Sequence, residues 1–463
     1  MPESPPTIAY LTAGAAGMYC GSCMHDNTLA RALARCGLDV QLIPTYTPIR
    51  TDEDNISVDR VFFGGINVYL QQKVPLFRHL PGLMLRFLDQ PWLIRWASAR
   101  AVEIDAKELG ALTLSMLRGE HGFQKRELRR LCLWLRDHVK PDLVVLSNML
   151  IAGCVPQVKR ETGAPVLVTL QGDDIFLEEL PEPFKQQAFE EIRKLVEEVD
   201  GFIVNSRYYA EFMGDYFGIG AEKFHIVPLG IDTDDYAAAD ASGEKHADIR
   251  ADDQPLRVGY LARLAPEKGL HVLVDAFLAL RKMPGMERAE LHIAGWLGEH
   301  RRKYAEEQFD KLRGAGLGDA FHYAGSVDHH GKIDFLRSLD VLSVPTVYHE
   351  PKGLFVLEAL AAGVPVVEPE HGAFPEMLAA TSGGRLVRPE DPAHLAETLH
   401  ELLAGRDICR ELGQRGCAIV RQQFNATSMA RQTLQMYGKF VPGLLTHLPV
   451  GVSEPLQARS ASK

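Results

Sequence analysis

The chain has 463 residues, of which 46% are hydrophobic and 24% charged, and its formal net charge is -11 at pH 7. This balance excludes a disordered or fibrous protein, and the length predicts two globular domains. The acidic charge argues against a nucleic-acid-binding protein, which needs a basic surface to neutralise phosphates. No apolar run reaches the roughly 18 residues of a membrane span, and the first residues lack the basic and apolar regions of a secretory signal. We therefore expect a cytoplasmic protein.

Short apolar segments alternate with longer helical patterns along the chain, which predicts parallel sheets covered by helices on both faces. The strands expected in the first half are nearly continuous apolar runs, as buried parallel strands are. They span residues 7–14, 39–46, 142–148, 165–172, 201–206 and 224–232.

The turn after the first expected strand contains Cys20 and Cys23, followed by His25. Seven cysteines in a large chain are an odd number, which fits reduced thiols better than a disulfide scaffold. Three interpretations of this turn stay open. It has a structural or acceptor-shaping role, it is a redox switch favoured by the lowered thiol pKa at a helix N-terminus, or it is a metal site.

Residues 73–100 interrupt the alternation with a mixture of large apolar side chains and arginines. A helical excursion packed on the domain is one interpretation of this segment. The other is a surface that lies on a membrane or folds over an acceptor, so peripheral membrane contact is among the expected partners.

Residues 237–253 are small, polar and charged, which predicts a linker between domains. A second series of strands follows at 256–264, 289–296, 320–327, 340–347, 363–370 and 384–388. The domains are therefore expected at 1–236 and 254–423, with a disordered tail at 446–463. The fold expected is α/β, with two doubly wound, Rossmann-like domains whose strand ends face a central cleft.

The segment 349–365 is the most informative for function. Glu350 lies in a turn, and a helix predicted to open near Gly353 is apolar almost all round, so it must be buried. Glu358 lies inside that helix, where an unpaired carboxylate would cost several kcal/mol. It needs an internal ion pair or the hydroxyl groups of a ligand. The backbone N–H groups of Gly353, Leu354 and Phe355 form an expected anion site.

Arg263 and Lys268 follow the first strand of the second series, in a loop that contains Pro266 and Gly269. Taken alone, they could be solvated loop cations. Arg offers a planar fork and Lys a point charge, so together they can clamp a diphosphate without a metal ion.

These residues carry a family resemblance. Glu350 and Glu358, separated by seven residues and followed by Ala-Leu-Ala-Ala-Gly-Val-Pro, resemble the signature of retaining glycosyltransferases of family 4. These are group 1 glycosyltransferases of GT-B fold, the family of glycogen synthase and sucrose-phosphate synthase. The Arg263 to Gly269 loop and the segments 204–206 and 228–232 match the same family, and the similarity runs from about residue 7 to about residue 440.

The resemblance implies transfer of a sugar, with retention, from a UDP-, GDP- or ADP-sugar to a carbohydrate, lipid or small-molecule acceptor, without a metal or a resident cofactor. Arg263 and Lys268 would hold the diphosphate, Glu350 the donor sugar and Glu358 the ribose. Gly353, Leu354 and Phe355 would meet phosphate or sugar, and the turn Gly325, Ser326 and Val327 would border the base. The helix at 424–445 would cross back to the first domain.

In the first domain, Gly17 belongs to a glycine turn that the family places near donor phosphate or acceptor, and Asn67 to a candidate acceptor wall. Gln171 stands where many members have His, and Asp174 ends the same short motif. Since an amide cannot carry a proton, this departure bears on the donor sugar and the catalytic detail. Lys352 replaces a common Phe on the sugar or acceptor side.

Other functions stay open from the sequence. A catalytically silent sugar-nucleotide sensor would fit Gln171 and the thiol pair, and a nucleotide-sugar epimerase would fit the same fold. A glycosyl phosphorylase needs a pyridoxal phosphate lysine, for which no clear motif is found. A nicotinamide enzyme needs a GxGxxG fingerprint, which is absent. His292 and His322 lie in strand patterns and are interpreted as core or surface residues rather than ligands.

Overall fold

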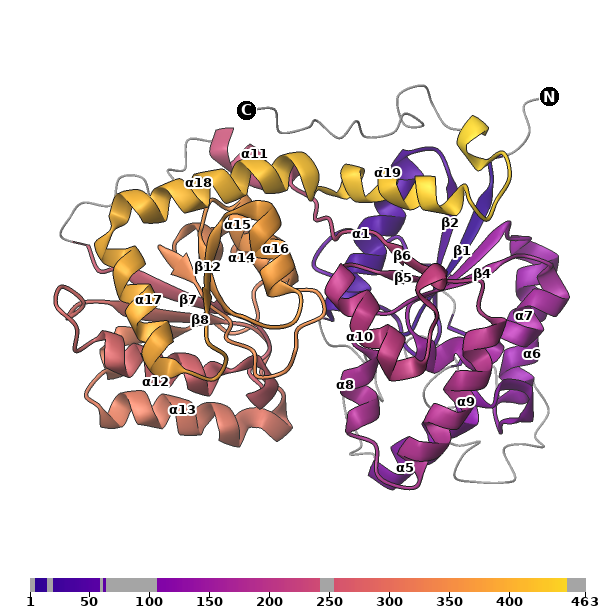
Figure 1. The fold of residues 1–463 in the computed structure, drawn as a ribbon, viewed down its shortest axis with the longest axis horizontal. Helices are drawn as coiled ribbons and strands as arrows, with labels where there is room; N and C mark the ends of the chain where they lie inside the picture. The colour runs from indigo at the N-terminus through magenta and orange to yellow at the C-terminus, as the bar shows by residue number, and fades with distance from the viewer. Residues whose placement is uncertain (1–4, 15–19, 59–60, 64–105, 242–253, 448–463) are drawn as a thin grey trace. The chain divides into compact units, whose positions relative to one another are not determined.

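The computed structural model describes residues 5–14, 20–58, 61–63, 106–241 and 254–447 (Figure 1). The chain divides into two compact units, of which unit 1 comprises Met1–Pro228 with Thr427–Lys463 and unit 2 comprises Leu229–Ala426. Each unit contains a six-stranded sheet whose strand pairs are all parallel. The predicted α/β class with two doubly wound domains is confirmed.

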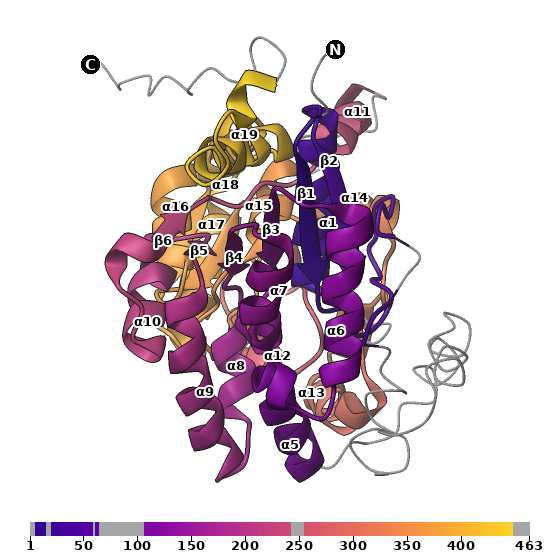
Figure 2. The ribbon, with the colours of Figure 1, turned by 90° about the vertical axis from the view of Figure 1, so that its right-hand side faces the viewer.

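In unit 1 the sheet order is β2-β1-β3-β4-β5-β6, an order of the flavodoxin type. Its strands are β1 (Thr7–Thr12), β2 (Asp39–Pro44), β3 (Leu143–Leu146), β4 (Val166–Thr169), β5 (Gly201–Val204) and β6 (Phe224–Ile226). All four residues of β3 are buried, although successive side chains point to opposite faces. Both faces of the sheet are therefore covered, and helices flank it on both sides (Figure 2).

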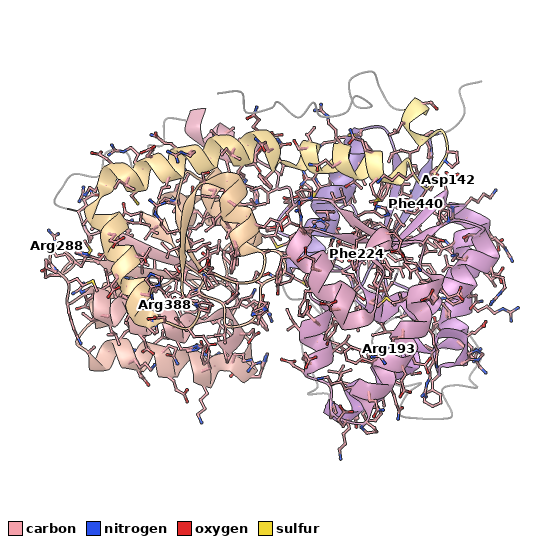
Figure 3. The ribbon with its side chains drawn as sticks, in the orientation of Figure 1. Asp142, Arg193, Phe224, Arg288, Arg388 and Phe440 are labelled. Atoms are coloured by element: carbon pink, nitrogen blue, oxygen red, sulfur yellow. The ribbon has the colours of Figure 1, made fainter. Side chains whose placement is uncertain are left out.

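The helices of unit 1 include one that the chain adds after it returns from unit 2. They are α1 (Gly21–Arg35), α5 (Ala106–Leu117), α6 (Lys125–Trp134), α7 (Val155–Thr162), α8 (Asp173–Glu178), α9 (Phe184–Glu198), α10 (Arg207–Phe217) and α19 (Ala426–Tyr437). Beyond α19, the ring of Phe440 packs edge-on against His225 of β6 with centroids 5.2 Å apart (Figure 3). The C-terminal segment thus belongs to the packing of unit 1.

In unit 2 the sheet order is β12-β11-β10-β7-β8-β9. Counted from the first strand of this unit, it is the order 3-2-1-4-5-6 of dinucleotide-binding domains. The strands are β7 (Arg257–Leu261), β8 (Glu290–Ala294), β9 (Phe321–Tyr323), β10 (Val341–Leu342), β11 (Val366–Pro369) and β12 (Gly384–Val387). One large apolar cluster, built from β7, β8, β10, β11 and the covering helices, forms the core.

The helices of unit 2 are α11 (Asp234–Ala241), α12 (Leu270–Leu280), α13 (Arg302–Gly314), α14 (His329–Arg337), α15 (Leu354–Ala361), α16 (Phe374–Thr381), α17 (Pro392–Ala404) and α18 (Arg406–Gln423). A short 3-10 helix, η7 (Pro266–Lys268), precedes α12. Residues 237–241, expected to be part of a linker, lie in α11, and the rest of that expected linker lies outside the described residues.

All twelve predicted strands are present, each at its expected place. The observed strands are shorter at their carboxyl ends, and the difference is large for the segments 224–232 and 340–347, of which Phe224–Ile226 and Val341–Leu342 are strand. The apolar composition continues past the last ladder hydrogen bonds because the following loop is buried too. Those loops carry the candidate site.

Candidate active site

In unit 2 the strand order reverses between β7 and β10. Ligands of doubly wound sheets bind beside the carboxyl ends of the strands at such a reversal. The loop after β7 carries Arg263 and Lys268, and the loop after β10 carries Glu350. The topology therefore brings the three residues with a predicted catalytic role to one edge of the sheet.

Lys268 and Glu350 form a direct ion pair at this edge. Lys268 Nζ lies 2.7 Å from Glu350 Oε2 and donates to Tyr348 Oη at 2.5 Å. The Tyr348 hydroxyl donates in turn to Glu350 Oε2. The side chains of Glu350 and Lys268 are 5% and 14% exposed, so the pair is largely removed from water. Tyr348 was not identified from the sequence, since a tyrosine two residues before the glutamate belongs to no motif.

The electrostatics of the pair keep Glu350 ionised. Burial alone raises the pKa of this carboxyl, but the charge and hydrogen bond of Lys268, with the Tyr348 hydroxyl and the charge of Lys352, lower the pKa of Glu350 to about 2. Burial and the neighbouring carboxylate raise the pKa of Tyr348, so its hydroxyl stays protonated and acts as a donor.

The depressed pKa predicts an acid-dependent loss of stability. Its contribution, on the order of 3 kcal/mol, is present above the unfolded pKa of about 4.5 and is lost as the pH falls from about 4.5 to about 2. We expect urea unfolding of Glu350→Gln to lack this component of the pH dependence. Equal pH slopes for both proteins over this range would contradict the assignment.

Local packing fixes the loop that carries Lys268. The hydroxyl of buried Tyr260 donates to the carbonyl oxygens of Arg263 at 3.1 Å and of Lys268 at 3.3 Å. Gly269 has φ +72°, and a Cβ there would lie 1.7 Å from the carbonyl oxygen of Pro345. Only glycine permits this approach, which places Lys268 beside the loop after β10.

Arg263 lies at the start of the same loop with a side chain that is 43% exposed. Its Nη2 lies 3.4 Å from Glu267 Oε1, a partner in the same loop. The guanidinium is thus accessible to an anion that approaches the carboxyl end of β7.

The turn of Glu350 is held by backbone contacts. Ala373 N donates to the Glu350 carbonyl oxygen at 2.9 Å, and a Cβ on Gly372 would come within 2.6 Å of the same oxygen. Lys352 N and Gly353 N donate to Glu350 Oε1 at 3.2 and 3.3 Å. The helix start that was expected to hold a ligand anion therefore already contacts the carboxylate of Glu350.

The predicted apolar helix is confirmed as α15, in which every residue from Phe355 to Ala361 is buried. Glu358 within it forms an ion pair with Lys332 of α14, with Lys332 Nζ 2.6 Å from Glu358 Oε1. Of the two alternatives left open by the sequence, the internal ion pair is thus observed. Lys332 was not identified from the sequence because it is 26 residues away on another helix.

A second carboxyl group lies beneath the site. Glu368 of β11 is fully buried, and its Oε1 accepts a hydrogen bond from Val344 N at 3.2 Å. Burial, with a smaller effect of Glu350, raises the pKa of Glu368 well above its usual value. The pKa values of Glu368 and Glu350 are therefore shifted in opposite directions.

The turn expected to border a nucleobase follows β9 at the same edge of the sheet. Gly325 has φ +75°, and its carbonyl oxygen accepts a hydrogen bond from Gly295 N, after β8, at 2.8 Å. Ser326 is exposed and Val327 half-buried. A backbone hydrogen bond thus connects the loops that follow β8 and β9.

In unit 1, Gln171 after β4 is buried and bound through its side-chain amide. Its Nε2 donates to Asp26 Oδ1 at 3.1 Å and to the Ser147 carbonyl oxygen at 2.9 Å. Asp26 is fully buried and also accepts hydrogen bonds from the hydroxyls of Tyr10 and Thr12. Gln171 is therefore oriented by a polar network that the sequence did not predict.

The neighbouring Asp174 is bound to helix α10. Its Oδ1 accepts a hydrogen bond from the Tyr209 hydroxyl at 2.6 Å, and that hydroxyl accepts one from Gly172 N. Asp173 accepts hydrogen bonds from Met149 N and Gln171 N. Burial raises the pKa of Asp173 to about 6 and also raises the pKa of Asp174.

In the turn of the thiol pair, the pKa of Cys23 is raised, whereas the redox interpretation relies on a lowered thiol pKa. Cys20 precedes α1 and Cys23 lies buried in its first turn. A hydrogen bond with Cys20, followed by burial, raises the pKa of the Cys23 thiol. His25 Nδ1 lies 3.2 Å from Asp26 Oδ1, in the polar network around Gln171.

Several predicted features lie outside the described residues. These are Gly17, Asn67, the segment 73–100 and the tail after residue 447. No helix in the described part of the chain is both long and apolar enough to cross a membrane.

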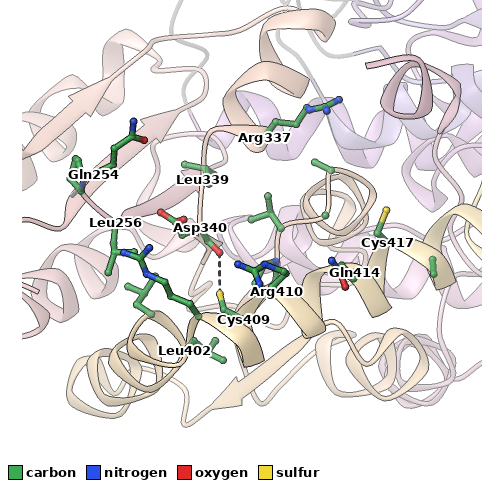
Figure 4. Close-up of a pocket in the computed structure, with 18 of the residues that line it drawn as sticks. Gln254, Leu256, Arg337, Leu339, Asp340, Leu402, Cys409, Arg410, Gln414 and Cys417 are labelled. Carbon is green, nitrogen blue, oxygen red and sulfur yellow. Dashed lines mark hydrogen bonds between the residues drawn. The ribbon is translucent and has the colours of Figure 1, made fainter. Parts of the chain in front are cut away.

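A cavity of about 400 Å³ in unit 2 lies at the other end of the strands (Figure 4). It is lined by residues that precede β7, β10 and β11, among them Leu256, Asp340 and Pro365, and by Arg410 of α18. Since ligands of this fold bind at carboxyl ends, this cavity is not the predicted donor site.

Two family models match the chain. Residues 242–418 match "Glycosyl transferases group 1", and residues 110–235 match "Glycosyltransferase Family 4". The D-inositol 3-phosphate glycosyltransferase of Nocardia farcinica is 23% identical over 86% of this chain and 90% of its own length. Several other curated relatives match over only about half of their length.

Solved structures show the same fold. Sucrose-phosphate synthase from Thermosynechococcus elongatus has a TM-score of 0.68 at 20% identity, over 94% of this chain and 98% of its own. An Anabaena protein in complex with UDP-glucose has a TM-score of 0.62 at 17% identity, over 94% and 99% of the two chains. The predicted GT-B fold is thereby confirmed.

Proposed function

We propose that this chain, which belongs to the group 1 glycosyltransferases and has the GT-B fold, transfers a sugar from a nucleotide-diphosphate sugar to an acceptor hydroxyl. We further propose that the reaction retains the anomeric configuration and needs no bound metal ion. The observation that carries the proposal is the buried Lys268–Glu350 pair at the strand-order reversal of unit 2.

Charge separation at the breaking bond gives each residue its role. As the bond between the anomeric carbon and the diphosphate oxygen breaks, negative charge builds on the diphosphate and positive charge on the sugar. Lys268 and Arg263 stabilise the negative charge on the diphosphate, and the ionised carboxylate of Glu350 stabilises the positive charge on the sugar. The acceptor oxygen attacks from the face that the diphosphate leaves, and its proton passes to the departing phosphate oxygen.

The remaining predicted residues bind the ends of the two substrates. Glu358, oriented by Lys332, receives the ribose hydroxyls, while Gly325–Val327 border the base. Lys352, Gln171 and Asp174 lie on the sugar or acceptor side. The donor is a UDP-, GDP- or ADP-sugar. Since the Nocardia relative is named for D-inositol 3-phosphate, this compound is the first acceptor to test.

A ligand screen followed by a transfer assay tests the function. We expect one of UDP, GDP, ADP or dTDP, and its sugar conjugate, to raise the melting temperature equally with and without Mg²⁺. A ligand at 100 times its Kd stabilises by about 2.7 kcal/mol. With the stabilising donor and an acceptor, we expect a product whose anomeric configuration, read by NMR, equals that of the donor.

Each part of the proposal has its own contrary result. Inverted product would exclude retention, and stabilisation only with Mg²⁺ would exclude the metal-free site. Nucleotide binding with neither transfer nor donor hydrolysis across an acceptor panel would favour a sensor.

A further inference from the structure

Three side chains with metal-binding groups meet on the sheet of unit 2, at β8 and β9. His292 and His322 are direct partners in the parallel register of these strands. Glu290 precedes His292 by two residues on β8, so its side chain points to the same face. From the sequence, both histidines are interpreted as core or surface residues rather than ligands. They are 30 positions apart, and the sequence alone does not show that their strands pair.

The opposite face of β9 is packed into the unit. The rings of Phe321 and Tyr323 lie 5.3 and 5.6 Å from that of Phe309 in α13. Alternation along the strand therefore turns His322 to the other face, where its side chain is 52% exposed. The cluster is thus open to an ion from solvent.

The ligand atoms have spacings that suit a single ion. Glu290 Oε2 lies 2.9 Å from His292 Nε2 and 4.0 Å from His322 Nε2, and one ligand atom from each residue lies within 4.8 Å of the others. Zinc binds imidazole nitrogen and carboxylate oxygen at about 2.0–2.2 Å, so two ligands of a tetrahedral ion lie about 3.4 Å apart. The two distances lie on either side of that value, and rotation of the exposed His322 ring would shorten the longer one.

The set of donors also fits the chemistry of a transition metal. Two imidazoles and one carboxylate, with water at the fourth position, suit Zn²⁺ and related divalent ions better than Mg²⁺ or Ca²⁺. Arg257 Nε lies 3.4 Å from Glu290 Oε2, so the carboxylate also has an ion-pair partner outside the cluster.

We propose that Glu290, His292 and His322 bind one divalent transition metal ion, Zn²⁺ in the first instance, which joins the edge strand β9 to β8. The site is separate from the candidate active site, since Glu290 begins β8 and Lys268 follows the carboxyl end of β7. The inference does not depend on the proposed function, because its readouts are metal binding and stability.

The test is calorimetric titration of ZnCl2 into untagged, EDTA-treated protein, with thermal unfolding measured in parallel. We expect one Zn²⁺ per chain and a higher melting temperature with Zn²⁺. We expect His322→Ala to weaken Zn²⁺ binding by more than about tenfold, the lower end of what loss of an outer partner alone costs. Glu290→Gln should weaken it too.

The matched control is His330→Ala. His330 is an exposed histidine of α14 in the same unit, and its ring also lies beside a histidine, with centroids 5.8 Å apart. We expect this variant to bind Zn²⁺ as the unchanged protein does. Absence of binding, or equal affinities in the His322→Ala and unchanged proteins, would overturn the proposal. Circular dichroism confirms that each variant is folded.

Discussion

Replacing Lys268 with alanine is expected to lower kcat/KM for sugar transfer by about 10²–10³-fold. The ammonium is largely removed from water and paired with Glu350, and removal of one preorganised group that stabilises a developing negative charge costs about this much. Initial rates with the donor found by the ligand screen measure the effect. Lys303→Ala, at an exposed position of α13, is the matched control and should leave kcat/KM unchanged.

The same substitution also affects stability, and the two effects can be separated. Without Lys268, Glu350 remains buried without its partner, which costs about 3–5 kcal/mol. The double variant Lys268→Ala/Glu350→Gln removes the unpaired charge, so we expect it to regain stability but not activity. The double variant reports on stability alone, because Glu350 has its own proposed role in transfer. An unchanged kcat/KM in the folded Lys268→Ala single variant would show that Lys268 acts only on the fold.

Gly269→Ala is expected to destabilise unit 2 by more than the left-handed backbone alone costs. A β-carbon at φ +72° costs about 1–2 kcal/mol, and here it would also meet the Pro345 carbonyl oxygen at 1.7 Å. The loop must then move away from the end of β10, which displaces Lys268. We therefore expect a lower kcat/KM as well.

The variant Gly285→Ala separates the cost of the left-handed backbone from the cost of the contact with Pro345. Gly285 has φ +80°, and a Cβ there would meet nothing within 4 Å. Urea unfolding should give about 1–2 kcal/mol for this variant and a clearly larger loss for Gly269→Ala. Equal losses would mean that the contact with Pro345 does not constrain the loop.

The sequence predicted the fold well because its strands are buried on both faces. Every residue of β3 and β4 is buried, so the segments read as continuous apolar runs between turns. The strand order could not be predicted in the same way, because it depends on which helices cross each face. The register that pairs His292 with His322 was hidden for the same reason.

The candidate site likewise contains residues that the sequence predicts and residues that it does not. Glu350 and Lys268 were predicted because each stands in a local pattern of charge, glycine and apolar residues. Tyr348 and Lys332 complete the site through contacts between separate loops and helices, for which a single sequence has no signal. The network of Asp26 and Gln171 likewise joins residues 145 positions apart.

Backbone contacts fix the loops that carry the candidate site residues. Gly269 approaches the Pro345 carbonyl, Val347 N donates to the Glu267 carbonyl at 3.0 Å, and Ala373 N donates to that of Glu350. None of these contacts depends on the side chains that face a substrate. The side chain at a position such as 352 can therefore change while the strand ends keep their spacing. New donor or acceptor preferences can arise on this scaffold without a new architecture.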